Sequence, residues 1–189
     1  MSINLLWKIL LYGWTAGEIY LAVRTRTSKG AGKLSDRGTL WILWLTMFSS
    51  IFAAEWSQHL VLQSVFPGAH WPRYAAVALL LAGLIIRWTA IVSLGRAFSV
   101  NVAIRADQTL YQGGLYRLVR HPSYTGMLFI FAALALAERS WFAFILLLTA
   151  PTIALLYRIH VEEIALREGF GDAYIQYSQR THRLIPGIY

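Results

Sequence analysis

The sequence predicts an all-α integral membrane protein, a bundle of five transmembrane helices with a cytoplasmic helical extension at the C-terminal end. Of the 189 residues, 57% are hydrophobic and 14% are charged, whereas about a quarter of the residues in a soluble domain are charged. The hydrophobic residues gather in long runs, and most of the basic residues lie between these runs. The net charge of +8 therefore indicates oriented membrane helices, and a nucleic-acid partner is not expected.

Five apolar runs define the predicted spans. Three have roughly 20 residues each, enough at about 1.5 Å per residue to cross about 30 Å of hydrocarbon; they are Ile3–Val23, Thr39–Leu62 and Tyr74–Leu94. The fourth run, Gly126–Ala137, is short, but a helix that starts at Pro122 would lengthen it, because proline is well tolerated in a first turn. The fifth extends from Trp141 to about Tyr157, and its closeness to the fourth predicts a tight helical hairpin.

The basic residues predict the orientation of these spans. With five spans, the clusters within residues 24–37, 96–120 and 158–183 all fall on one side of the membrane. The opposite side carries only Arg73, Arg139 and, at the start of the first span, Lys8. Because positive charge gathers on the cytoplasmic side, the N-terminus is predicted outside and the C-terminus in the cytoplasm.

The predicted cytoplasmic tail contains two helical segments. The fifth helix is expected to continue through "RIHVEEIALREG" and to stop at Gly169, since glycine commonly ends a helix. A short amphipathic helix then follows in "GDAYIQYSQR", where Tyr174 and Tyr177 share a face. The whole chain, 1–189, is read as a single domain in which 1–94 hold three spans and 95–189 hold a polar loop, the hairpin and the tail.

The polar stretch "YRLVRHPSYTG", residues 116–126, interrupts this apolar chain. His121 and Pro122 place a helix N-terminus at the cytoplasmic boundary, and its free N–H groups suit an electron-rich ligand group. Tyr116 and Tyr124 could bracket a flat or cationic ligand. The alternative is that the two arginines of the stretch only orient the protein and its tyrosines only anchor it at the interface.

A second polar cluster, "YRIHVEE", lies in the tail. Glu162 follows Arg158 by four residues and shares its helix face, whereas Glu163 is turned about 100 degrees away. An ordinary ion pair on a solvated helix would explain the spacing of Arg158 and Glu162. The antiparallel hairpin, however, predicts that this turn lies beside His121 and Tyr124.

Several site chemistries are absent from the sequence. The chain has no cysteine, which excludes a disulfide, a thiolate metal site and a cysteine nucleophile. A metal site is not expected, because His160 and Glu162 are two residues apart on a helix and face different directions. The glycines at 169 and 171 follow a helix and lack a third glycine, so a Rossmann nucleotide site is not expected either.

Two pairs of ionisable residues fall inside the predicted spans. Glu18 and Arg87 lie at similar depths from the cytoplasmic side, and we expect them to pair, either as a purely structural contact or as the mark of a substrate portal. Glu55 and His59 are one turn apart and could form a hydrogen-bonded pair, for which no catalytic role is predicted.

The C-terminal half of the chain resembles a known family. The stretch "GGLYRLVRHPSYTG", followed by "RIHVEEIALREGFGDAYIQYSQRTHRLIP", is similar to the catalytic half of the isoprenylcysteine carboxyl methyltransferases. These are integral membrane enzymes that use S-adenosylmethionine, and phospholipid N-methyltransferases are more distantly similar. The resemblance covers roughly residues 83–186, and the first two spans match only in character.

The resemblance implies a role for each matching residue. Arg158 matches the arginine assigned to the substrate carboxylate, and Arg120 supports the site; both are the predicted catalytic residues. The best-known family member has histidine where this chain has Gln108. The S-adenosylmethionine site would be the loop of the C-terminal half together with one tail residue: Gln108, Thr109, Leu110, Tyr111, Tyr116, His121, Pro122, Ser123, Tyr124 and Glu162.

The resemblance also implies an activity. The expected enzyme is an S-adenosylmethionine-dependent methyltransferase that methylates a lipophilic or prenylated acceptor at the cytoplasmic face, among membrane lipids and without a metal. The alternatives within methyl transfer are a phospholipid N-methyltransferase and a small-thiol S-methyltransferase. An NADPH-dependent sterol-reductase-like protein, whose C-terminal part also resembles RHPxYxG, and a non-enzymatic membrane scaffold or transporter are the alternatives of other classes. The compact size resembles prokaryotic family members and predicts a prokaryotic plasma membrane.

Overall fold

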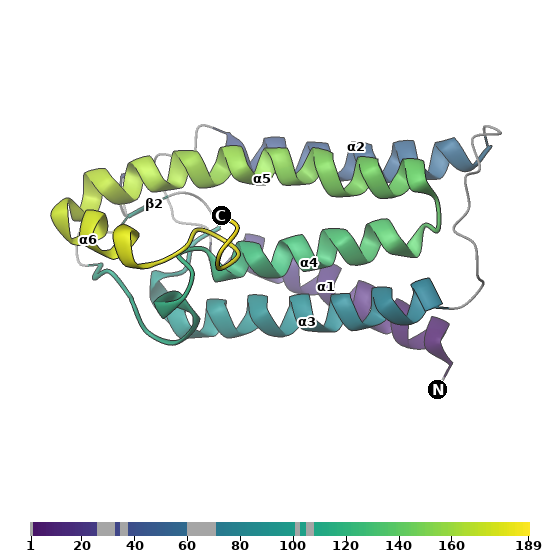
Figure 1. The fold of residues 1–189 in the computed structure, drawn as a ribbon, viewed down its shortest axis with the longest axis horizontal. Helices are drawn as coiled ribbons and strands as arrows, with labels where there is room; N and C mark the ends of the chain where they lie inside the picture. The colour runs from purple at the N-terminus through teal and green to yellow at the C-terminus, as the bar shows by residue number, and fades with distance from the viewer. Residues whose placement is uncertain (1, 26–32, 35–37, 60–70, 101–102, 105–107) are drawn as a thin grey trace.

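The computed structural model describes residues 2–25, 33–34, 38–59, 71–100, 103–104 and 108–189. Within these residues the chain is a helical bundle, which confirms the predicted all-α class (Figure 1). Its α-helices are α1 (Ile3–Arg24), α2 (Thr39–His59), α3 (Trp71–Leu94), α4 (Pro122–Ala137), α5 (Trp141–Phe170) and α6 (Asp172–Arg180). Short 3-10 turns form η1 (Gly95–Ala97) and η2 (Gly114–Arg117), and the two-residue strands β1 (Lys33–Leu34) and β2 (Ala103–Ile104) pair antiparallel.

The helix ends follow from local sequence signals. Ser140 caps the start of α5, where its hydroxyl accepts a hydrogen bond from the Ala143 N–H, and α4 starts at Pro122 as expected. The predicted stop of the fifth helix at Gly169 is wrong. α5 continues to Phe170 because Gly171, with φ of 53°, adopts the left-handed conformation that ends the helix, and its N–H binds the Arg167 carbonyl.

The structure confirms the character of an integral membrane protein. Among the described residues, three segments are long and apolar enough to cross a membrane, Thr39–Trp56, Trp71–Ala97 and Trp141–Phe170. α4 has 16 residues and is shorter. α1 and α4 nevertheless belong to the same bundle (Figure 1). Residues 60–62, the end of the second predicted run, lie outside the described residues.

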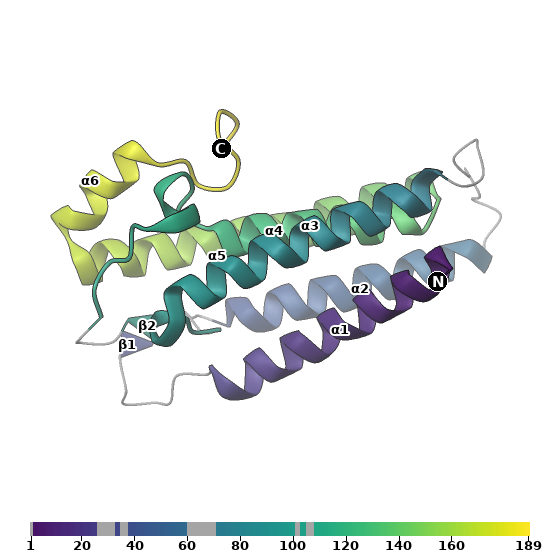
Figure 2. The same cartoon turned by 90° about the horizontal axis from the view of Figure 1, so that it is seen from below.

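The helices pack in pairs along the bundle. α4 and α5 form the predicted hairpin and α2 runs beside α5 (Figure 1). α1 lies against α3, and Figure 2 shows the bundle from below. α3 and α4 approach most closely at Gly83 and Gly126. A Cβ added to Gly83 would lie 2.7 Å from the Gly126 carbonyl oxygen, and one added to Gly126 would lie 2.6 Å from the Gly83 oxygen. Only glycine fits at this crossing, a common device of membrane helices.

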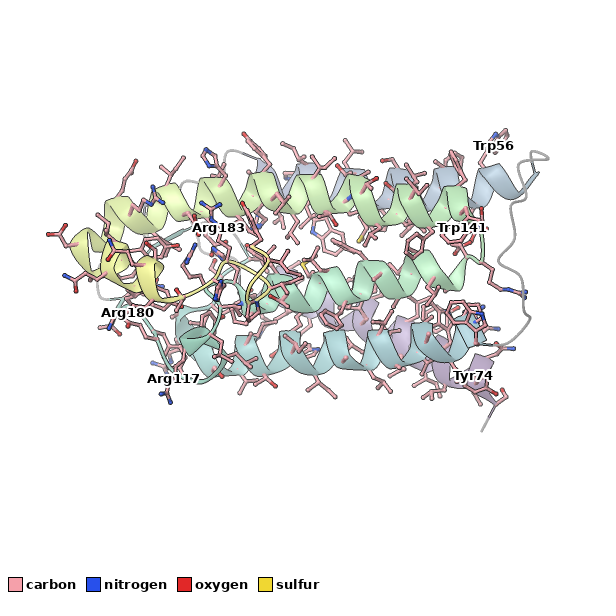
Figure 3. All side chains as sticks on the ribbon, viewed as in Figure 1. Trp56, Tyr74, Arg117, Trp141, Arg180 and Arg183 are labelled. Atoms are coloured by element: carbon pink, nitrogen blue, oxygen red, sulfur yellow. The ribbon has the colours of Figure 1, made fainter. Side chains whose placement is uncertain are left out.

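The two ends of the bundle differ in character. Figure 3 shows Arg117, Arg180 and Arg183 at the end where α6 lies, and the aromatic residues Trp56, Tyr74 and Trp141 at the opposite end. The bundle between them has an apolar core that includes fully buried Leu80, Ile130 and Leu155. Polar chemistry therefore gathers at the α6 end of the protein.

The C-terminal tail holds the polar stretch in place at this end. After α6 the chain returns beside residues 118–121, where Val119 and His182 form an isolated parallel bridge. The N–H groups of Arg120 and His121 donate to the carbonyls of His182 and Arg183 at 2.8 and 3.1 Å. The segment just before α4 is thus fixed by residues more than fifty positions later in the sequence, a contact that local sequence patterns do not reveal.

Candidate functional site

All of the predicted site residues except Pro122 line one cavity at the α6 end of the bundle. Pro122 is fully buried in the first turn of α4. The cavity is bordered by residues of all six helices and of the segment between α3 and α4. The predicted residues in its wall are Gln108, Thr109, Leu110, Tyr111, Tyr116, Arg120, His121, Ser123, Tyr124, Arg158 and Glu162.

A chain of hydrogen bonds joins the two predicted clusters through Tyr124. Its hydroxyl accepts from Arg158 Nε at 2.9 Å and donates to Glu162 Oε2 at 2.6 Å. The hairpin therefore places the tail cluster beside Tyr124, as predicted. Arg158 and Glu162, which share a face of α5, are linked through this hydroxyl of α4.

The guanidinium of Arg158 is further oriented by two residues that were not among the predicted site residues. Nη1 donates to the Thr39 hydroxyl, at the start of α2, at 2.9 Å. Nη2 donates to the Val100 carbonyl, after η1. The side chain is only 3% exposed, so its planar fork is held in a fixed direction at the cavity wall.

Glu163 is the centre of a second cluster, which the sequence reasoning missed. Its carboxylate accepts from Arg120 Nε and from Arg183 Nε, both at 3.0 Å. His121 Nε2 lies 3.4 Å from the same carboxylate, which is longer than a good hydrogen bond. Glu163 is turned away from Glu162, as its position on the helix predicts, and faces the returning tail. The tail arginine reaches it only because residues 182–183 pair with residues 118–121.

Arg120 connects the tail to the site. Besides Glu163, its guanidinium donates from Nη1 to the Ser178 carbonyl at 2.9 Å and to the Thr181 carbonyl. These carbonyls are at the end of α6, where the backbone oxygens lack partners within the helix. Arg120 also lines the cavity. Its contacts with Glu163 of α5 and with the end of α6 hold these two helices together.

Glu18 and Arg87 form the predicted ion pair. Arg87 Nε and Nη2 donate to the two carboxylate oxygens at 2.6 and 2.7 Å, and Arg87 Nη1 donates to the Ser123 hydroxyl at 2.8 Å. Both partners are buried and line the cavity. The pair therefore joins α1 and α3 to the first turn of α4. Of the other predicted pair, Glu55 is exposed on α2, and the side chain of His59 lies outside the described residues.

Buried tyrosines form another part of the wall. The Tyr177 hydroxyl donates to the Tyr116 carbonyl at 2.7 Å. Burial, opposed by the nearby Arg120 charge, raises the pKa of Tyr177 to about 12, so this hydroxyl keeps its proton at neutral pH. Burial and, to a lesser degree, Glu162 also raise the pKa of Tyr116. The His121 ring stacks on Tyr124 with 5.6 Å between centroids.

The cavity has a polar part and an apolar part. Its polar groups come from the loop, the hairpin and α6, together with the Glu18–Arg87 pair of α1 and α3. Its apolar side chains come largely from α2 and from the end of α3 with the segment that follows, among them Leu40, Leu43, Trp44, Leu94 and Phe98. The sequence reasoning did not implicate α2, because the pairing of α2 with α5 depends on packing between distant segments. Such a cavity can hold a polar ligand beside a long apolar one.

Comparisons with known proteins agree with this arrangement. The isoprenylcysteine carboxyl methyltransferase (ICMT) family matches residues 75–168. Protein-S-isoprenylcysteine O-methyltransferase B of Arabidopsis thaliana is 30% identical over 139 residues, which span 65% of this chain and 65% of that protein. A probable protein-S-isoprenylcysteine O-methyltransferase of rice, Oryza sativa subsp. indica, is 33% identical over 140 residues, 69% of this chain and 71% of its own.

A solved structure and a bacterial protein are also similar. The solved structure of a eukaryotic intramembrane Ras methyltransferase, ICMT, has a TM-score of 0.63 and 25% identity, and covers 77% of this chain and 52% of its own. Methanethiol S-methyltransferase 1 of Bradyrhizobium diazoefficiens is 39% identical over 72 residues, 38% of this chain and 24% of that protein. The matches thus span between 24% and 71% of the length of these relatives, with the rice protein highest. The chain belongs to the isoprenylcysteine carboxyl methyltransferase family.

Proposed function

We propose that this chain, as one domain, is an S-adenosylmethionine-dependent membrane methyltransferase that methylates the carboxylate of a prenylated cysteine. The observation that carries the proposal is the hydrogen-bonded chain from Arg158 through Tyr124 to Glu162, in a cavity with a polar and an apolar part. The relatives named as protein-S-isoprenylcysteine O-methyltransferases support the same activity. Membership of a methyltransferase family favours methyl transfer over the reductase and scaffold alternatives.

The polar part of the cavity fits the methyl donor. Glu162 offers a carboxylate acceptor for hydroxyl or amino groups, and Tyr116 and Tyr124 offer aromatic surfaces for a flat or cationic group. Gln108 to Tyr111 and His121 complete this part of the wall. S-adenosylmethionine, when bound, supplies a methyl group on a sulfonium sulfur. The residues of the chain then have to bind the two ligands, align them and exclude water.

Arg158 is the residue suited to the acceptor. Its fork geometry matches a carboxylate, and Tyr124 and Thr39 hold the guanidinium in one direction. A carboxylate reaches the site already ionised, so its attack on a methyl group requires no general base. Alignment of two reactants contributes several kcal/mol to such a displacement, and a closed site strips water from the attacking oxygen. The apolar side chains of α2 provide a surface for a prenyl chain.

We further propose five spans, with the N-terminus outside and the C-terminus in the cytoplasm. The arginines at the α6 end support this orientation, because they lie beside the predicted site for a water-soluble donor (Figure 3). α1 and α4 run along the length of the bundle with the three apolar helices, α1 at an incline (Figure 1), which supports their crossing the membrane. The prokaryotic plasma membrane remains a prediction from the compact size of the chain.

A second candidate acceptor is a small thiol. All three nitrogens of the Arg158 guanidinium already donate to protein oxygens, those of Tyr124, Thr39 and Val100. A carboxylate would have to replace or share one of these partners, whereas an uncharged thiol would not. The bacterial relative named methanethiol S-methyltransferase supports this reading.

Transfer of a labelled methyl group decides between the two acceptors. We expect the purified full-length protein in lipid nanodiscs to move label from S-adenosylmethionine to a farnesylated cysteine as a base-labile methyl ester. The same compound with its carboxylate already blocked as an ester is the matched control and should take no label. If only a short alkanethiol takes the label, the acceptor is a thiol and the proposed carboxylate acceptor is wrong. If neither compound takes the label, both proposed acceptors are wrong.

A further inference from the structure

One buried hydroxyl in the cavity wall has no partner in the part of the chain that the structure describes. Tyr174 lies on α6, is 1% exposed and lines the cavity. Its hydroxyl oxygen is fully buried and makes no hydrogen bond to any described residue. Buried polar groups are nearly always hydrogen-bonded, because leaving one unpaired costs stability.

Tyr177 provides a direct comparison on the same helix. It lies one turn further along α6, is similarly buried, and lines the same cavity. Its ring is 6.0 Å from that of Tyr174, between centroids. The Tyr177 hydroxyl, however, donates to the Tyr116 carbonyl at 2.7 Å. The two tyrosines are therefore alike in side-chain type and burial. They differ in that the Tyr177 hydroxyl has a protein partner, whereas the Tyr174 hydroxyl has none among the described residues.

The surroundings of Tyr174 combine aromatic rings with charged groups of both signs, since Glu163 and Arg120 both lie near its hydroxyl. Phe170 and Tyr177 also line the cavity, and α6 folds against the end of α5 (Figure 2). Burial and then the nearby Glu163 charge raise the pKa of Tyr174, so the phenol keeps its proton. A neutral phenol can donate one hydrogen bond and accept others. This combination suits a flat ring that carries nitrogen acceptors and an amino donor at its edge.

We propose that Tyr174 binds the heteroaromatic base of the methyl donor. A polar atom at the edge of the base would be the hydrogen-bond partner of the Tyr174 hydroxyl. The inference rests on the proposed function and adds a residue that the family resemblance did not assign. Tyr174 is here a ligand contact that discriminates the donor, with no part in the methyl transfer step itself. The bound donor then provides the partner that this hydroxyl lacks among the described residues.

The test compares Tyr174→Phe with Tyr177→Phe in the full-length protein. Removing an unpaired hydroxyl should leave the melting temperature of the free protein unchanged or raise it. The same variant should bind S-adenosylhomocysteine about tenfold more weakly, the usual effect of one lost hydrogen bond. Adenosine should show a similar fold-loss, because it carries the same base. Tyr177→Phe loses a formed hydrogen bond and should instead melt at a lower temperature.

Three results would overturn the inference. Equal affinity of the parent and Tyr174→Phe for both probes would show that the hydroxyl does not contact the donor. A lower melting temperature of Tyr174→Phe would show that the hydroxyl has a partner within the protein. If the parent protein binds neither probe, the proposed function fails together with the inference. If the parent binds both probes and Tyr174→Phe binds them equally well, only the inference about Tyr174 fails.

Discussion

Arg158→Ala is expected to lower kcat/KM for a farnesylated cysteine by about 100-fold or more. The guanidinium is the one cationic group of the cavity that we assign to the acceptor, and it is buried and held by Tyr124, Thr39 and Val100. Without it, the acceptor carboxylate loses its charged partner and its alignment with the donor. Initial rates at varied acceptor concentration, with the donor saturating, measure this effect.

Three comparisons separate this role from a loss of folding. Arg158→Lys keeps the charge but cannot reproduce the planar fork, so a large part of the loss should remain. Thr39→Val removes one contact that orients the guanidinium and should cause a smaller loss, of about tenfold. Transfer to a thiol acceptor, if it occurs, should be much less sensitive to Arg158→Ala. A folded Arg158→Ala protein that methylates the carboxylate at nearly the parent rate would contradict the assigned role.

Glu18→Gln is expected to lower the free energy of unfolding by about 3 kcal/mol. The substitution leaves the guanidinium of Arg87 buried in the bundle without its counter-ion, and the amide that replaces the carboxylate can accept only one of the two hydrogen bonds that Arg87 donates. Because Arg87 also holds the Ser123 hydroxyl, the first turn of α4 should loosen as well. Unfolding followed by tryptophan fluorescence in mild detergent measures the change.

The matched control carries the same substitution elsewhere in the membrane helices. Glu55 is exposed on α2, and Glu55→Gln should cause no loss of stability. Replacing both partners, as in Glu18→Leu with Arg87→Met, should be less damaging than Glu18→Gln, because an apolar pair leaves no buried charge. If the double replacement were as unstable as Glu18→Gln, the ion pair would not be the source of the effect.

The features that could be predicted from the sequence are those that depend on nearby residues or on the membrane itself. Helix positions follow from the length of apolar runs, because hydrocarbon leaves the backbone no other partners than its own. The pairing of Glu18 with Arg87 could be predicted from their depths, since a lone charge in a membrane is costly and the helical rise is fixed. The contact of Tyr124 with the tail cluster could be predicted because the connection between α4 and α5 is short, so the two helices must run antiparallel side by side.

The parts of the site that could not be predicted depend on long-range packing. Glu163 was given no role, because its partner Arg183 reaches it only after the tail returns beside residues 118–121. The contribution of α2, through Thr39 and the apolar cavity wall, requires knowing which helices are neighbours. The end of α5 was missed by a short distance, because the sequence offers glycines at 169 and 171 and only Gly171 takes the left-handed conformation.

Equilibrium binding of S-adenosylmethionine and of NADPH to the purified protein tests the central claim most directly. We predict saturable binding of S-adenosylmethionine and no tight binding of NADPH. Glu162→Gln should weaken the S-adenosylmethionine complex about tenfold, because it removes a charged acceptor from the cavity. The control Glu168→Gln, exposed on the same helix, should bind like the parent. Tight binding of NADPH without S-adenosylmethionine, or an unchanged affinity in Glu162→Gln, would contradict this account.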